Sequence, residues 1–144
     1  MANLKLKQYQ TEATKAKVAG ADPYIITQML MAGVVDSLAQ AKGAVERKDF
    51  EIKGQSIAKA TNIIEALRTS LDFEAGGDVC QNLYSLYEYM QGRLVDATVE
   101  TEATTAIDEV VTLFKQIKEA WDSIPPEARQ EAEIQRKQNL ASAV

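Results

Sequence analysis

Proline is confined to the two ends of a long central region of this chain. Only three prolines occur among the 144 residues, at Pro23, Pro125 and Pro126. Because proline removes a backbone hydrogen bond and kinks a helix interior, the region between them is free to be almost entirely helical. The length corresponds to about one domain, and 46% hydrophobic residues are enough to build a core. We therefore expect a single all-α domain.

Apolar residues recur at helical spacing along this region. Asp22 can cap a first helix and Pro23 suits its first position, so this helix is expected over residues 23–47. Its inner face consists of Ile26, Leu30, Val34, Leu38, Ala41 and Val45. A short link at 48–50 leads to a second helix that ends near Leu71. The inner face of that helix is Ile57, Ala60, Ile64, Leu67 and Leu71.

Two adjacent glycines separate the second helix from the third. Gly76 and Gly77 tolerate positive φ and can end a helix, and Asp78 offers a side-chain cap to the next one, which we expect to begin there. Its inner face is predicted to be Val79, Leu83, Leu86, Met90, Leu94 and Ala97, with a second, outward apolar line at Cys80, Tyr84 and Tyr87. A fourth helix is expected to start at Thr101 and Glu102 and to end before Pro125. Its inner face is Ala103, Ile107, Val110, Phe114, Ile117, Trp121 and Ile124.

Four helices of about 20 to 25 residues with short connections predict an antiparallel up-down-up-down four-helix bundle over residues 21–124. Residues 1–20 precede the capped start, and four of them share a helical face, so this segment can dock as a short amphipathic helix or stay loose. These four are Leu6, Tyr9, Ala13 and Ala16. Residues 125–144 carry many charges and hardly any apolar stripe, which predicts a flexible or frayed C-terminal tail.

Charge and the N-terminal sequence exclude several classes of partner. The chain has 16 basic and 21 acidic residues, a net charge of −5, and its Lys and Arg residues are scattered. Without a basic stripe to neutralise phosphates, nucleic acid is not an expected partner. The apolar runs are short, and the N-terminus lacks the apolar region of a secretory signal. We therefore expect a cytosolic protein without membrane insertion.

The residues that most enzymes need are missing. The chain has no histidine, which removes the commonest general base and the commonest metal ligand. The predicted inner positions are apolar, so a carboxylate-bridged metal site inside the bundle is not expected. Gly76 and Gly77 lack the spaced glycines and Lys of a nucleotide loop. Cys80 is the only cysteine and is expected to be a small hydrophobe. We expect no enzyme, no cofactor and no bound metal.

Apolar side chains exceed what one core requires. Tyr84, Tyr87 and Tyr89 fall within six residues of one helix, and successive helical positions point in different directions. Each ring can pack on a neighbouring helix with its hydroxyl at the rim, or some can line a groove for a partner helix. The apolar positions left over by the predicted inner faces are Ile25, Met29, Ile63, Cys80, Tyr84 and Tyr87. The residues alone leave both interpretations open.

The segment around the double glycine resembles the FliS family of flagellar export chaperones, which hold flagellin before secretion. The matching residues are Leu71, Asp72, Glu74, Gly76, Gly77, Asn82, Leu83, Leu86, Tyr87, Tyr89 and Met90. Further matches in the right order are Pro23, Met29, Leu30, Gly33, Gly54, Ala60 to Ile64, Glu119, Ala120 and Trp121, so the resemblance spans roughly residues 6–124. The chain departs from the family pattern at Met31 and Ala32, where an aromatic residue and Asp are usual, and at Thr98, where Asn is common.

This resemblance implies a cytosolic chaperone for type III flagellar export. Such a protein binds the C-terminal segment of flagellin, which wraps around the bundle as helices, and prevents premature polymerisation. The leftover apolar positions would form the groove, and residues 1–20, through Leu6 and Tyr9, would act as a lid over part of it. Export-gate components or flagellar regulatory proteins are further conceivable partners. Two other functions stay open: a regulatory adaptor that sequesters a signalling protein, and a structural homodimer.

Overall fold

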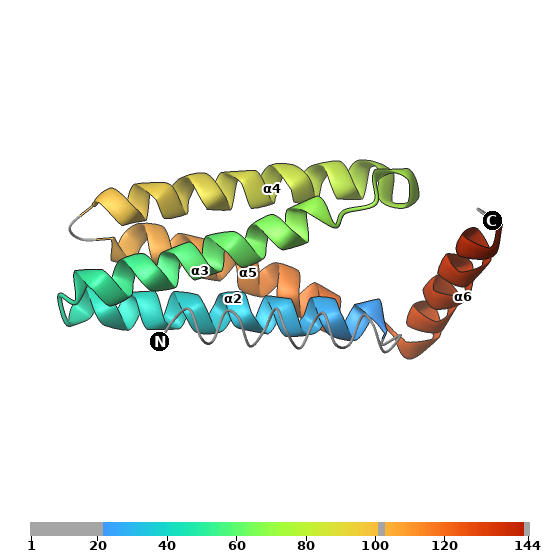
Figure 1. Cartoon of the computed structure of the whole chain (residues 1–144), viewed down its shortest axis with the longest axis horizontal. Helices are drawn as coiled ribbons and strands as arrows, with labels where there is room; N and C mark the ends of the chain where they lie inside the picture. Colours follow the sequence, from blue (N-terminus) through green and yellow to red (C-terminus); the bar gives the residue numbers. More distant parts are fainter. Residues whose placement is uncertain (1–21, 101–102, 143–144) are drawn as a thin grey trace.

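A computed structural model of the chain describes residues 22–100 and 103–142 (Figure 1). Within those ranges every regular element is an α-helix: α2 (Pro23–Glu46), α3 (Phe50–Thr69), α4 (Phe73–Val99), α5 (Thr104–Asp122) and α6 (Pro126–Ser142). The main contacts among these helices join α2 to α3, α3 to α4, α4 to α5 and α5 to α2. Helices α2 to α5 therefore form an antiparallel four-helix bundle, and the predicted fold class is confirmed.

Local capping fixes where α2 and α3 begin. Asp22 Oδ1 accepts a hydrogen bond from the backbone N–H of Tyr24 at 2.9 Å, and Pro23 follows the cap, as predicted. Asp49 Oδ1 accepts from the N–H of Ile52 at 3.1 Å and starts α3 in the same way. Such bonds give a hydrogen-bond acceptor to backbone N–H groups of the first helical turn, which have no partner within the helix. Lys48, with φ of 58°, makes the tight turn between the two helices.

The core lies along the axis of the bundle and follows the predicted inner faces of α2, α3 and α5. The side chains that are fully buried there include Val34, Leu38, Ala41, Ile57, Ala60, Ile64, Ile107, Val110 and Phe114. Leu71, Ile117 and Trp121 are partly buried and pack against this core from the end of the bundle. Met31, one of the departures from the family pattern, is also a core residue. The inner faces of these three helices are confirmed except at Ile26 and Ile124, which are partly exposed and lie outside the core cluster.

The predicted inner face of α4 is wrong at three positions, Val79, Cys80 and Tyr87. Val79 is 66% exposed, whereas Tyr87 is 2% exposed and belongs to the core cluster. The core line of α4 contains Cys80, Tyr87, Met90, Leu94 and Ala97, with Leu83 and Leu86 partly buried beside it. Because both 86 and 87 lie one helical turn before Met90, spacing fits either choice equally well. The fold buries the larger aromatic ring, which removes more apolar surface from water.

The double glycine divides α4 into a single helical turn and a long helix. Residues Phe73 to Gly76 form one helical turn, and Gly77 then leaves helical geometry with φ of 51° and ψ of −126° before the long part of α4 continues. Asp72 Oδ1 accepts from the N–H of Glu74 at 3.1 Å at the start of this turn. The break at Gly77 is confirmed, but α4 already begins at Phe73 and not at Asp78.

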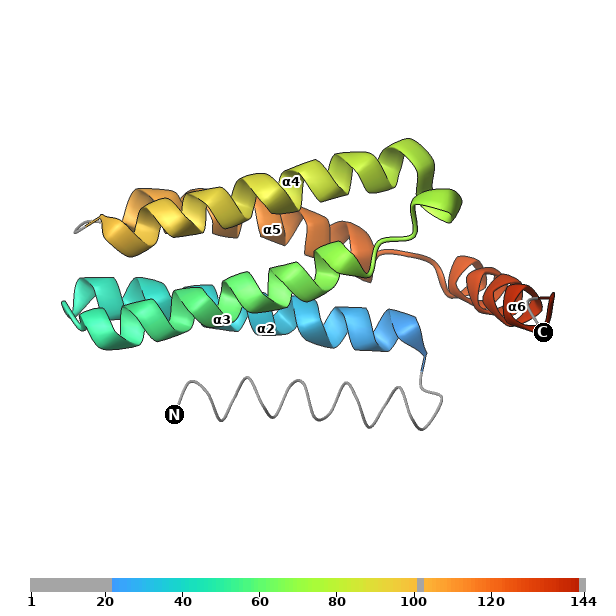
Figure 2. The same cartoon turned by 45° about the horizontal axis from the view of Figure 1, so that its top comes forward.

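The other end of the chain forms a helix outside the bundle. The predicted start of the fourth helix, Thr101 and Glu102, lies outside the described residues, and α5 itself begins at Thr104. After α5, helix α6 points away from the bundle (Figure 2) and has no buried residue. Its base is tied to α2, because the Arg129 guanidinium carbon lies 4.4 Å from the centre of the Tyr24 ring.

Candidate partner-binding surface

The first turns of α2 present apolar side chains to solvent. Ile25 is 48% exposed and Met29, one turn further along the same face, is partly exposed. The neighbouring Tyr24 is buried, because successive helical residues point to different sides. Its ring stacks on Trp121 of α5, with ring centres 5.3 Å apart and planes at 13°. The stacking of Tyr24 thus fixes the rotation of α2 that turns Ile25 outward.

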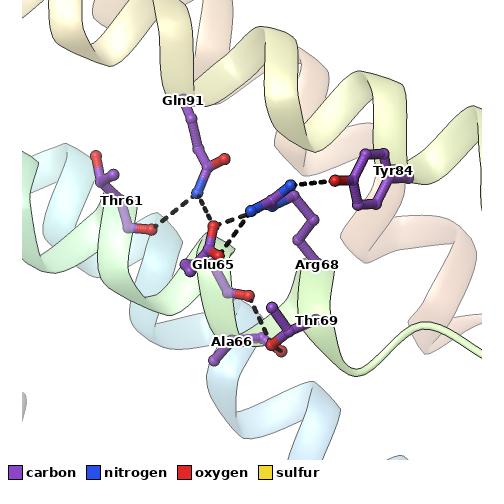
Figure 3. Close-up of polar contacts among 7 residues, drawn as sticks. All are labelled: Thr61, Glu65, Ala66, Arg68, Thr69, Tyr84 and Gln91. Atoms are coloured by element: carbon purple, nitrogen blue, oxygen red, sulfur yellow. Dashed lines mark hydrogen bonds and ion pairs between the residues drawn. The ribbon is translucent and has the colours of Figure 1, made fainter.

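Tyr84 lies at the edge of the contact between α3 and α4 and is partly exposed. Its hydroxyl oxygen accepts a hydrogen bond from Arg68 Nη1 at 2.5 Å (Figure 3). The Arg68 guanidinium carbon is 4.8 Å from the ring centre, and Phe73 meets the ring edge-on, with centres 5.7 Å apart. The Tyr84 ring is therefore held between a cation and an aromatic neighbour, both of which are favourable arrangements.

A polar network bridges α3 and α4 beside Tyr84 (Figure 3). Glu65 accepts two hydrogen bonds from Arg68, at 2.7 Å and 2.9 Å, and Gln91 of α4 donates to the same carboxylate at 2.9 Å. The hydrogen bonds from Arg68 and then Gln91 hold the pKa of the Glu65 carboxyl below its usual value, and Glu65 raises the pKa of Arg68. Both groups stay charged at neutral pH, so the network has no proton to exchange there.

A second polar network bridges α4 and α5. The Tyr89 hydroxyl donates to Glu109, and Arg93 Nε donates to the other oxygen of that carboxylate at 3.0 Å. The bond from Tyr89, followed by that from Arg93, keeps the pKa of Glu109 below its usual value. Tyr89 is half exposed, yet its hydroxyl is fixed by α5. The tyrosines near the double glycine therefore have different roles: Tyr87 fills the core, while Tyr84 and Tyr89 join α4 to its two neighbours.

Three residues predicted to lie outside the core are buried instead. These are Ile63 and Tyr87, each 2% exposed, and Cys80, which is 9% exposed. Ile63 precedes the inner position Ile64, and both side chains belong to the core cluster, so α3 buries two adjacent positions and not a single line. Burial also raises the pKa of Tyr87 to about 12. The prediction that these three side chains form an open groove is wrong.

The remaining predicted contacts fall into two groups. Ile25, Met29 and Tyr84 are accessible in the folded chain and stay candidate contacts. Leu6 and Tyr9, the predicted lid residues, lie outside the described residues. The accessible apolar residues that the prediction did not include are Phe73, which is 45% exposed, and Val79 near the double glycine, and Phe50, Val95, Val99, Ile134 and Leu140 elsewhere. Phe73 directly follows Asp72, and an Asp in this place is typical of a helix N-cap. The sequence therefore contains a signal for the helical turn before the glycines.

The accessible surface of residues 22–100 and 103–142 offers apolar side chains for packing and polar side chains for hydrogen bonding. Within residues 22–100 and 103–142, no three His, Cys, Asp or Glu side chains are grouped so as to hold a metal ion. None of the helices in that part of the chain is long and apolar enough to span a membrane. This surface can bind the apolar face of a partner helix, because its accessible apolar side chains are not needed to fill the core.

Comparison with known proteins gives a consistent result. The family model described as flagellar protein FliS matches residues 5–128, so most of α6 lies beyond the match. The flagellar secretion chaperone FliSB of Pseudomonas aeruginosa is 45% identical over 119 residues, which cover 83% of this chain and 94% of the relative. The FliS chaperones of Vibrio cholerae and Salmonella typhimurium are 37% and 38% identical. Those alignments cover 85% of this chain in each case, and 89% and 91% of the two relatives.

Proposed function

The chain belongs to the FliS family of flagellar secretion chaperones, and we propose that it binds the C-terminal segment of flagellin in the cytosol. In this role it acts without catalysis. It covers the apolar helix faces through which flagellin subunits polymerise and keeps the subunit competent for export. Export-gate components or flagellar regulatory proteins are further candidate partners on the same family grounds.

One observation carries the proposal: large apolar side chains remain accessible on a bundle whose core is closed. Ile25 and Met29 lie four residues apart on α2, the spacing at which side chains share one helix face. Tyr84 presents part of its ring between α3 and α4. Accessible apolar groups on rigid helices are suited to an amphipathic helix, which provides apolar residues at the same spacing.

The energetics of such binding suit a chaperone that must release its cargo. A disordered segment that folds onto the bundle gains apolar burial but loses conformational entropy in the same step. This ordering costs on the order of 2 to 5 kcal/mol of the gross interaction energy. Binding can therefore be specific and still reversible. The accessible residues lie at two places, on α2 and at the edge between α3 and α4, and one extended segment that wraps the bundle can reach both.

The proposal is tested by titration calorimetry with two forms of flagellin. We expect full-length flagellin to bind at one-to-one stoichiometry and a C-terminally truncated form not to bind detectably, because one extended segment reaches both places on the bundle. A negative heat-capacity change should accompany binding, since apolar surface is buried. Equal binding by both forms would falsify the proposal and leave the adaptor and homodimer functions to be tested.

A further inference from the structure

The helical turn at residues 73–76 is a structurally separate part of α4. On one side it is joined to the long part of α4 through Gly77, whose φ of 51° and ψ of −126° lie outside helical geometry. On the other side, residues 70–72 connect it to α3 without regular structure. Since the backbone leaves helical geometry at Gly77, the turn can pivot there without unwinding the helix that follows.

This turn covers two side chains of the long part of α4. The Cys80 thiol donates to the backbone carbonyl of Asp72 at 3.2 Å. Gly76 lies so close to Cys80 that a Cβ atom built on it would be 2.0 Å from the sulfur. Phe73 covers the edge of the Tyr84 ring, with ring centres 5.7 Å apart. As a result Cys80 is buried although it lies near the end of the bundle.

The turn buries little apolar surface against the described residues 22–100 and 103–142. Phe73 remains 45% exposed, so its contact with Tyr84 covers only part of the ring. At the start of the turn, Asp72 caps Glu74, and its carbonyl accepts from the N–H of Gly76 at 2.9 Å. Segments with little buried apolar surface open at a lower free energy than the core does. By contrast Tyr87, two turns further along α4, is part of the core cluster.

We propose that the 73–76 turn is a lid, hinged at Gly77, that opens while the bundle stays folded and uncovers Cys80 and Tyr84. The uncovered surface accepts one large apolar side chain from the cargo helix, which takes the place of Phe73. This second step rests on the proposed function, whereas the opening itself is a property of the free protein. The two steps are therefore measured separately.

Opening is measured by the rate at which a thiol reagent labels Cys80, the only cysteine of the chain. We expect labelling of the full-length protein to proceed by local opening. The rate should then depend little on urea at low concentration and should exceed the rate allowed by global unfolding measured by circular dichroism. If the labelling rate of Cys80 instead equals the rate allowed by global unfolding and has the same urea dependence, the turn does not open separately and the lid proposal is wrong.

Two exposed phenylalanines provide a matched pair of variants. Phe73→Ala removes the ring contact with Tyr84 and should raise the labelling rate about three- to tenfold with little change in the urea midpoint. Phe50→Ala is the control, because Phe50 is similarly exposed but lies at the start of α3, away from the turn. It should leave labelling unchanged. Equal rates in both variants would contradict the proposal.

Two glycines on α4 provide a second pair of variants. Gly76→Ala places a methyl group against the Cys80 sulfur and breaks the Cys80–Asp72 contact, so it should also speed labelling. Gly92→Ala is its control, since a Cβ there meets no atom within 4 Å, and labelling should not change. If Gly76→Ala labels no faster than Gly92→Ala, the turn does not protect Cys80 and the lid is wrong.

The cargo step is tested by adding the C-terminal segment of flagellin to the wild-type protein. Bound segment should slow Cys80 labelling, and Phe73→Ala should bind it more tightly than Phe50→Ala because no ring has to be displaced. If the segment binds but the labelling rate and the relative affinities of the two variants stay unchanged, the cargo helix does not place a side chain under the lid. Absence of any calorimetric binding would instead contradict the proposed function, while the labelling of the free protein still decides whether the lid opens.

Discussion

The indole N–H of Trp121 donates a hydrogen bond to the backbone carbonyl of Tyr24 at 3.2 Å, across 97 residues of sequence. The two rings also stack, and the Arg129 guanidinium lies over the Tyr24 ring. The end of α5, the start of α2 and the base of α6 therefore meet at one aromatic ring. This contact sets the rotation of α2 and with it the outward position of Ile25.

The hydrogen bond and the ring stack of Trp121 can be separated by substitution. Trp121→Phe keeps an aromatic ring but loses the bond to Tyr24, which should cost about 0.5 to 1.5 kcal/mol of unfolding free energy. Trp121→Ala also removes the stack and should cost more. Urea unfolding followed by circular dichroism gives both values. Equal losses in the two variants would mean that the ring stack contributes nothing.

Tyr87 and Tyr84 should respond differently to truncation. Tyr87→Ala leaves a cavity in the core and should cost about 3 to 5 kcal/mol of unfolding free energy, as for other large buried aromatics. Tyr84→Ala removes a partly exposed ring and should cost clearly less. Urea midpoints of the two variants give the comparison. A smaller loss for Tyr87→Ala than for Tyr84→Ala would place Tyr87 outside the core.

The buried phenol of Tyr87 should make the fold sensitive to alkaline pH. Burial raises its pKa from 10.0 to about 12, so the unfolded chain loses this proton at a pH where the folded chain still keeps it. Stability therefore falls as pH rises through this window, by about 3 kcal/mol in total. Tyr87→Phe has no phenol to ionise, and its unfolding free energy should fall less between about pH 9 and about pH 12. Identical pH profiles for wild type and variant would contradict this assignment.

The Glu65 carboxylate should contribute to stability at neutral pH and lose that contribution in acid. Its pKa in the folded chain lies below the usual 4.5 because Arg68 and Gln91 donate to the charged form. The contribution is present above the usual pKa and disappears as pH falls through the lowered one. Urea midpoints measured from neutral pH down to about pH 3 should therefore drop more for wild type than for Glu65→Gln. An equal drop in both would mean that the network in Figure 3 does not stabilise the fold.

The sequence was sufficient to predict the bundle because several independent signals agreed. Asp22 and Pro23 mark the start of α2, and strict three- and four-residue spacing marks the inner faces of α3 and α5. Each of these signals is local, so it needs no knowledge of the neighbouring helices. The Gly77 break was also predictable, since glycine accepts the positive φ found there.

The candidate surface was less predictable, because it depends on how the helices are rotated against each other. On α4, apolar residues occupy adjacent positions such as Leu86 and Tyr87, so spacing alone left the inner face ambiguous by one residue. Ile63 falls outside the single inner line that spacing predicts for α3, yet its side chain is only 2% exposed. The networks at Glu65 and Glu109 join different helices and become visible only once the helices are paired.

The central claim is that the accessible apolar face of α2 contacts the C-terminal segment of flagellin, and two isoleucines test it directly. Ile25→Asp puts a charge on that face, while Ile134→Asp puts the same charge on α6 at a residue that is 57% exposed. Asp in the first turn of α2 also suits the helix dipole, so Ile25→Asp should stay folded. We expect the calorimetric affinity of Ile25→Asp for the segment to fall by about fivefold to more than a hundredfold, and that of Ile134→Asp to stay within about twofold of wild type. Wild-type affinity in Ile25→Asp, or an equal loss in both variants, would contradict the claim.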